Sequence, residues 1–173
     1  IWARSAWAGS QRYPVHWGGD AEVSAIGMAC SLKGGLSLGL SGFTFWSHDI
    51  GGFSAAPNEE LFKRWAFFGL LSSHTRVHGF PPREPWFFSE DFQNTFRKIV
   101  ELRYKLMPYI FTQAYIASQQ GLPLMKALLL NYPDDETAWF IDDTYLLGED
   151  LLVAPLMENT TARKVYLPAG KWI

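Results

Sequence analysis

The sequence lacks several features that would have assigned it to a class of protein. Its single cysteine, Cys30, cannot form an internal disulfide, and we expect it to be a small buried hydrophobe within a helix. One cysteine weakly favours a reducing compartment, and so a cytoplasmic location. No apolar run reaches about 18 residues, so no membrane-spanning helix is predicted. There is no initiator methionine and no signal-peptide pattern, and the sequence stops at Ile173 in what resembles a strand, so both ends are expected to be cuts through a longer protein.

Charge of one sign is also missing. The sequence has 15 Lys and Arg against 17 Asp and Glu, a net charge of −2, and no basic run that could follow a phosphate backbone. A nucleic-acid partner is therefore not expected. With 48% hydrophobic and 18% charged residues, the composition is that of a globular protein. The aromatic content of 16% favours stacking surfaces for flat ligands such as sugar rings, although core packing explains most aromatics in most proteins.

The pattern of elements changes along the chain. Helices are predicted over residues 22–33, where Gly34 and Gly35 should end the helix, and from a cap at Asn58 to just before Ser72. A long helix is predicted from a cap at Ser89 through residue 119 to a stop at Gly121, and Pro108 should kink or divide it. Strands are predicted at 1–3, 42–46, 124–130, 145–147, 151–155 and 164–167. The first part alternates strands and helices, whereas the last part has short strands only. The sequence therefore predicts an α/β region over residues 1–121 and the start of an all-β region over 122–173.

The loop Arg-Tyr-Pro-Val-His-Trp-Gly-Gly-Asp, residues 12–20, is the first candidate for chemistry. Pro14 and the glycines exclude a regular helix or a core strand. The loop can bring Asp20 against the indole of Trp17, where desolvation would favour the protonated acid that glycosidic bond cleavage requires. An Asp after Gly-Gly is also a common turn or helix-cap residue, and that alternative stays open from this loop alone.

Further polar residues follow the other predicted strands. His48 and Asp49 end the aromatic strand at 42–46 and precede two glycines, which is where α/β barrels place their catalytic groups. Arg76 and His78 alternate, so in an extended segment they would point to the same side. Arg4, after the first strand, could bind a sugar or pair with a neighbouring acid. Each of these residues could equally serve a structural role.

Taken together, these segments resemble glycoside hydrolase family 31, and within it the bacterial α-xylosidases. The blocks that carry the resemblance are Arg4-Ser5, residues 12–20, Phe45-Trp46-Ser47-His48-Asp49-Ile50-Gly51-Gly52-Phe53, Arg64-Trp65, Arg76-Val77-His78-Gly79, Tyr145-Leu146-Leu147-Gly148-Glu149-Asp150 and Val153-Ala154-Pro155. The resemblance implies a (β/α)8 TIM barrel, present here from about strand six through helix eight, followed by the start of a β-sandwich domain. Family members are retaining, exo-acting α-glycosidases that need no metal or organic cofactor.

The resemblance also implies roles for individual residues. Asp20 matches the general acid/base and Trp17 an aromatic of the same pocket. Arg4, Asp49 and His78 match residues that hydrogen-bond the sugar, and Phe53 matches a wall of its pocket.

The family's nucleophilic Asp lies upstream and is absent, so the isolated chain is expected to be inactive and to need the missing upstream half of the barrel. The expected ligand is a terminal α-xyloside. An α-glucoside, a non-catalytic carbohydrate-binding module, a purely structural domain and self-association remain open.

Overall fold

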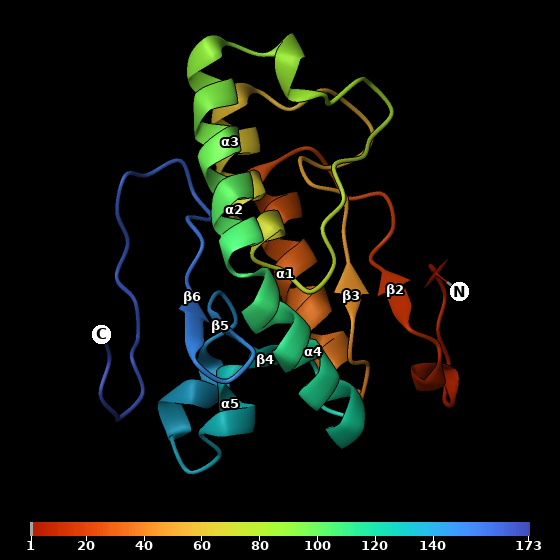
Figure 1. The fold of residues 1–173 in the computed structure, drawn as a ribbon, viewed down its shortest axis with the longest axis vertical. Coiled ribbons are helices and arrows are strands. Elements are labelled where there is room, and N and C mark those ends of the chain that lie inside the picture. Colours follow the sequence, from red (N-terminus) through yellow and green to blue (C-terminus); the bar gives the residue numbers. More distant parts are fainter. Residues whose placement is uncertain (1) are drawn as a thin grey trace.

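The computed structural model describes residues 2–173, and Ile1 lies outside the described part. Within that part, a parallel sheet and an antiparallel sheet lie on opposite sides of a group of helices in the view of Figure 1. Helix α1 contacts strands of both sheets. The two sheets are therefore separate, and both pack against the same layer of helices.

The parallel sheet has the order β1 (Trp2–Ala3), β2 (Val15–Trp17) and β3 (Trp46–Ser47). A parallel bridge between Ser47 and His74 adds a fourth position beside β3. If the His74 segment is the eighth strand of a barrel, β1 is the fifth rather than about the sixth. The strand predicted at 42–46 was placed too early, because only Trp46 and Ser47 pair with β2.

The strand predicted at 1–3 is present at Trp2–Ala3, while Ile1 lies outside the described residues. The side chain of Trp2 is 41% exposed, because β1 is hydrogen-bonded to β2 on one side and is an edge of the sheet on the other. The residues after β1 reach β2 through a single short 3-10 turn, η1 (Ser10–Arg12). A parallel crossover usually carries a longer helix that covers the sheet, so this edge is thinly covered.

Helix α1 (Ala25–Leu40) begins at Ser24, whose Oγ accepts a hydrogen bond from the Gly27 amide at 2.9 Å. The prediction that Gly34 and Gly35 end this helix was wrong. A Cβ at Gly35 would lie 2.6 Å from the Trp46 ring, so glycine there permits close packing of the helix on β3 instead of a turn. The burial predicted for Cys30 was also wrong, because its side chain is on the exposed side of α1.

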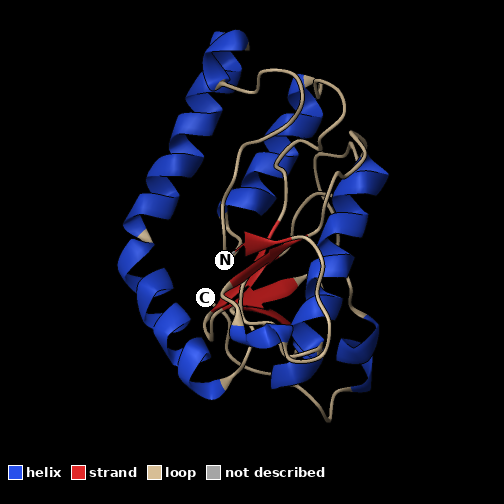
Figure 2. Ribbon diagram, turned by 90° about the vertical axis from the view of Figure 1, so that its right-hand side faces the viewer, coloured by secondary structure: helices blue, strands red, loops and turns tan. Residues whose placement is uncertain are grey.

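The other long helices follow their predictions. Helix α2 (Glu59–Leu70) is capped by Asn58, and α3 (Glu90–Lys105) is capped by Ser89. Helix α4 (Met107–Gln120) starts at the break before Pro108, and together α3 and α4 form a long bent rod along one side of the molecule (Figure 2). Gly121 ends α4 in the left-handed conformation, with φ of 70°. The short 3-10 turn η2 (Pro85–Phe87) precedes α3.

The antiparallel sheet has β5 (Tyr145–Leu147) between β4 (Met125–Ala127) and β6 (Leu151–Val153). The strand predicted over 124–130 is only partly present, because Leu128 begins a short helix, α5 (Leu128–Asn131), and η3 (Glu136–Phe140) follows. Residues 164–167 form no ladder, contrary to prediction. They run outside β6 (Figure 1), where Arg163 binds the carbonyls of Asp143 and Pro155 at 3.1 and 2.8 Å.

One hydrophobic core joins the two sheets. Trp46 of β3, Phe62 and Trp65 of α2, and Tyr145 and Leu147 of β5 all belong to it. The Tyr145 hydroxyl donates to the Leu71 carbonyl at 2.7 Å, at the end of α2. A boundary at residues 121–122 is still a proposal, since the core runs across it. None of the helices within residues 2–173 combines the length and hydrophobicity needed to cross a bilayer.

Candidate active site

Three loops that follow neighbouring parallel strands meet at one end of the sheet. The Phe53 amide donates to the Ala21 carbonyl at 2.9 Å, and the Phe80 amide donates to the Phe53 carbonyl at 2.8 Å. The Ile50 amide donates to the Arg76 carbonyl at 3.1 Å. These backbone bonds tie together the segments that carry Asp20, Asp49 and His78. The carboxyl ends of adjacent parallel strands therefore place the three groups at one edge, as a barrel does.

Asp20 is the exposed carboxylate of this edge. Its side chain is 44% exposed, and its Oδ1 lies 3.7 Å from Arg4 Nη1. Gly19, with φ of 79°, lets the chain turn against the Arg4 guanidinium, which a Cβ at this position would meet at 2.8 Å. The sequence predicted that Trp17 would desolvate Asp20. In the structure the carboxylate is 44% exposed, and its charged neighbour is Arg4, which also lies over the indole of Trp17.

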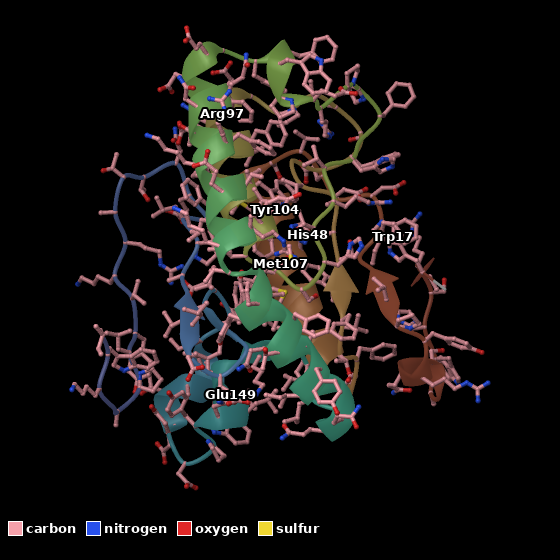
Figure 3. All side chains as sticks on the ribbon, in the orientation of Figure 1. Trp17, His48, Arg97, Tyr104, Met107 and Glu149 are labelled. Carbon is pink, nitrogen blue, oxygen red and sulfur yellow. The ribbon has the colours of Figure 1, made fainter. Side chains whose placement is uncertain are left out.

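Trp17, the last residue of β2, forms the aromatic wall of the same edge (Figure 3). The Arg4 Cζ atom is 5.7 Å from the centroid of the Trp17 ring, and the ring of Trp2 meets it edge-on at 6.1 Å. Arg4, predicted either to bind sugar or to pair with an acid, therefore contacts both an acid and an aromatic ring. Its own side chain is 58% exposed and retains donors for a ligand.

Asp49 differs from Asp20 in being fully buried. One oxygen, Oδ1, accepts a hydrogen bond from Arg76 Nη2, and the other, Oδ2, has no protein partner among residues 2–173. Burial raises the pKa of the Asp49 carboxyl, while Arg76 and His78 oppose that rise and the charge of Asp20 adds to it. These influences require the four groups to lie near one another. The Oδ2 atom of Asp49 is therefore a buried acceptor that lacks a protein partner among the described residues.

His78 and Phe53 form the opposite wall. Their ring centroids are 5.6 Å apart, with the planes tilted by 40°. The loop behind them is fixed by Arg83, which is buried and donates to the carbonyls of Gly52 at 2.6 Å and Ala55 at 2.7 Å. Arg83 also donates to the His78 carbonyl at 3.1 Å. A buried arginine that satisfies several carbonyls holds this wall in place.

His48 does not belong to this group, although the sequence leaves a catalytic role open for it. Its ring is stacked on Phe68 at 4.3 Å and on Trp46 at 4.8 Å, behind β3 and toward α2 (Figure 3). Burial lowers the pKa of His48 to about 3. Successive strand residues point to opposite sides, so His48 packs into the core while Asp49 faces the site.

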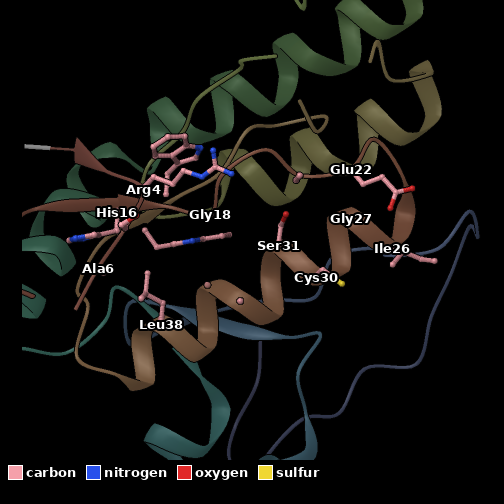
Figure 4. Close-up of a pocket in the computed structure, with 16 residues that line it drawn as sticks. Arg4, Ala6, His16, Gly18, Glu22, Ile26, Gly27, Cys30, Ser31 and Leu38 are labelled. Atoms are coloured by element: carbon pink, nitrogen blue, oxygen red, sulfur yellow. The ribbon is translucent and has the colours of Figure 1, made fainter. Parts of the chain in front are cut away.

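A cavity of about 610 Å³ lies between β2 and α1 (Figure 4). Arg4, with His16 and Trp17 of β2, borders it on one side, and Cys30 and Leu38 of α1 border it on the other. The described residues that line it do not include Asp20, Asp49 or His78. The cavity is therefore behind the strands rather than at the carboxylate edge. Within residues 2–173, no three His, Cys, Asp or Glu side chains gather as metal ligands.

Two residues of the edge were not assigned from the sequence. Trp2 packs against His74, with ring centroids 5.0 Å apart, and its signal was only its place one residue before the end of a strand. Arg83 lies in a proline-rich loop and binds backbone carbonyls, which no sequence pattern specifies. Arg76 was noted for its alternation with His78, yet its partner Asp49 was not predicted.

Comparison with known proteins gives the same assignment as the blocks of residues. A sequence model described as "Glycosyl hydrolases family 31 TIM-barrel domain" matches residues 1–113. A second, "Glycosyl hydrolase family 31 C-terminal domain", matches residues 121–173. The chain belongs to glycoside hydrolase family 31. In this family-31 chain, the parallel sheet and helices are the last part of the TIM barrel and the antiparallel sheet is the start of the β-domain.

Relatives of known name include both xylosidases and glucosidases. An α-xylosidase of Emericella nidulans is 44% identical over 169 residues, which are 97% of this family-31 chain and 22% of that protein. An α-glucosidase of Bacillus thermoamyloliquefaciens is 37% identical over 174 residues, 98% of this chain and 22% of that protein. This chain thus spans about a fifth of the length of these relatives.

Solved structures show the same likeness in three dimensions. A family-31 α-xylosidase from a soil metagenome, complexed with xylose, has a TM-score of 0.91 and 35% identity, over 96% of this chain and 29% of that one. A family-31 dextranase of Flavobacterium johnsoniae, complexed with glucose, has a TM-score of 0.90 and 38% identity, over 98% of this chain and 22% of that one.

Proposed function

We propose that this chain carries the acid/base half of the active site of a retaining, exo-acting α-glycosidase, and that the substrate is a terminal α-xyloside. The observation that carries the proposal is the pairing of an exposed carboxylate, Asp20, with a buried one, Asp49, at adjacent strand ends. The exposed acid can exchange protons with substrate and water. The buried one, with a free Oδ2, can accept a sugar hydroxyl.

In the proposed first step, a carboxylate from the upstream part of the barrel attacks the anomeric carbon. Asp20 gives its proton to the glycosidic oxygen as the bond to that oxygen breaks, and the aglycone leaves as an alcohol. A covalent glycosyl-enzyme ester remains. In the second step Asp20 takes a proton from water, the water oxygen attacks the anomeric carbon, and the ester bond breaks to release the sugar.

The other site residues are proposed to hold the sugar. Asp49, Arg4 and His78 would hydrogen-bond the ring hydroxyls, and bonds that tighten as the ring flattens lower the barrier. Trp17 and Phe53 would form the apolar walls. Asp49 is a poor candidate for the missing nucleophile, since one of its oxygens is already hydrogen-bonded by Arg76. This supports the proposal that the nucleophile comes from upstream.

Replacing Asp20 by Ala in the complete parent enzyme tests the proposal. Turnover of an unactivated α-xyloside should fall by about 10²- to 10⁴-fold. With α-xylosyl fluoride, the rate of the first step, formation of the glycosyl-enzyme, should fall much less, because fluoride leaves without a proton. Glu22→Ala, an exposed acid two residues along the same loop, is the matched control and should leave both rates unchanged. Equal losses on the two substrates, or none, would remove Asp20 from the acid role.

The relatives support an α-glucosidase of the same family as a second candidate, because a named α-glucosidase matches as completely as the α-xylosidase does. The two substrates differ by the C6 hydroxymethyl group, so the distinction depends on the space beside that carbon. Comparing kcat/KM for aryl α-xyloside and aryl α-glucoside on the parent enzyme decides between them. A higher value for the xyloside supports the first candidate, and a higher value for the glucoside replaces it.

A further inference from the structure

The guanidinium of Arg76 joins the buried carboxylate to the aromatic wall. It donates through Nη2 to Asp49 Oδ1. Its Cζ atom lies 4.2 Å from the centroid of the Trp2 ring and 5.5 Å from that of Trp17. A guanidinium held by a carboxylate at one edge and by two indoles at its face has little freedom to rotate.

This contact has a consequence for Asp49. A buried carboxylate is costly unless a cation and hydrogen bonds compensate it. Arg76 is the cation that Asp49 contacts, and it uses one carboxylate oxygen only. The Oδ2 atom is therefore left as a charged acceptor with its direction set. Burial raises the pKa of Asp49, and Arg76 is the principal influence that opposes the rise.

We infer that Arg76 is a positioning residue of the proposed site: it keeps Asp49 ionised and directs Asp49 Oδ2 toward the sugar. The rings of Trp2 and Trp17 pack against the Arg76 guanidinium and hold it in place. The inference rests on the proposed function and adds a residue to it. Arg76 is only 23% exposed at its side chain and donates through Nη2 to Asp49, so its role in the proposed site runs through Asp49 rather than through direct contact with the sugar. Trp2 becomes part of the site as the support of Arg76.

The test uses the complete parent enzyme with Arg76→Gln and Arg76→Lys. For Arg76→Gln, KM for the aryl α-glycoside should rise about tenfold, the value of one charge-assisted hydrogen bond. The acid limb of kcat/KM against pH should move to higher pH, because Asp49 stays buried without its cation. For Arg76→Lys the acid limb should stay near that of the wild type, because lysine keeps the positive charge. KM should stay raised, because an ammonium cannot stack on the indoles or donate two hydrogen bonds in the fixed planar geometry of a guanidinium.

Two controls separate positioning from stability. Arg97→Gln changes an exposed arginine on α3 (Figure 3), whose side chain donates to Asn94 one helical turn earlier, and should leave KM and the acid limb unchanged. In an Asp49→Asn background, Arg76→Gln should no longer move the limb. A residue with a purely structural role would lower the melting temperature and leave both kinetic readouts in place.

Each outcome decides the inference. A folded Arg76→Gln variant with wild-type KM and limb would overturn it. If that variant does not fold, Arg76→Lys decides, since an unchanged KM in that enzyme also overturns it. Wild-type parent enzyme and Asp20→Ala are assayed in the same series. An Asp20→Ala variant that is as active as the wild type rejects the proposed function, and the Arg76 inference falls with it for that separate reason.

Discussion

The two sheets of this chain differ in how deeply their strands are buried. In the antiparallel sheet the middle strand, β5, is fully enclosed, with Tyr145, Leu146 and Leu147 each at most 1% exposed. In the parallel sheet the outer strand, β1, leaves Trp2 at 41% exposed, and Asp20 and Arg4 beyond the strand ends are open to solvent. The antiparallel sheet buries its central strand among the described residues. The parallel sheet carries the candidate site at an edge that is open to solvent.

This comparison assigns stability and activity to different places. Substitutions in β5 should change the free energy of unfolding and leave the reaction alone. Those at the parallel edge should change the reaction. In the proposed function, the second carboxylate comes from the upstream part of the barrel, on the open side of this edge.

The largest expected effect is the complete absence of turnover by the isolated 173-residue chain. Without an upstream nucleophile no glycosyl-enzyme can form, and Asp20 alone cannot replace it. An assay of the purified chain with aryl α-xyloside measures this, with the complete parent enzyme as the positive control. Turnover by the chain alone would mean that the edge of the parallel sheet is a complete active site, and it would contradict the contrast drawn between the two sheets.

Leu147→Ala in β5 should reduce the free energy of unfolding of the parent enzyme by about 2–5 kcal/mol, because the side chain is fully buried in the shared core. Leu167→Ala, at a leucine that is 49% exposed, is the control and should change it little. Chemical denaturation measures both. The kcat/KM of the folded Leu147→Ala enzyme should equal that of the wild type, and a selective loss of activity would contradict the separation of roles.

His48 should make the core sensitive to acid. Its pKa is lowered to about 3 in the folded protein against 6.5 in the unfolded chain, so between these values the unfolded state binds the extra proton. Stability is fully present above 6.5 and is lost on acidification, by about 1.4 kcal/mol per pH unit at most. His48→Phe should flatten the dependence of stability on pH between pH 6.5 and 5. An unchanged slope would show that His48 is not the group responsible.

The smallest expected effects come from the two adjacent glycines of α1. Gly35→Ala puts a methyl group against Trp46 and should cost about 1–3 kcal/mol. Gly34→Ala meets no atom within 4 Å and should stabilise by about 0.5–1 kcal/mol, since alanine is the better helix former. Melting temperatures of the two variants measure this. Equal shifts would show that helix propensity alone governs both positions.

Local signals predicted the helix caps and breaks well. Asn58 and Ser89 begin helices, Pro108 divides one, and Gly121 ends one, because each effect depends on the residue's own backbone or side chain. Gly35 was misread as a helix stop, since glycine there serves close packing against Trp46, a ring eleven residues away in the sequence. Gly34 was misread with it, although a Cβ at Gly34 would meet no atom within 4 Å. The ladder of residues 164–167 was predicted from β-propensity alone, which specifies no partner strand.

The sequence by itself determined the family and the order of strands and helices, and it named Asp20, Asp49 and His78 as residues at strand ends. Short-range rules of capping, alternation and turn chemistry suffice for that. Only the tertiary structure decided that Asp20 is open and paired with Arg4, that Asp49 is buried against Arg76, and that His48 faces the core. The physical reason is that burial and charge pairing depend on distances between segments that are far apart in the chain, and these distances are set when the strands pack side by side.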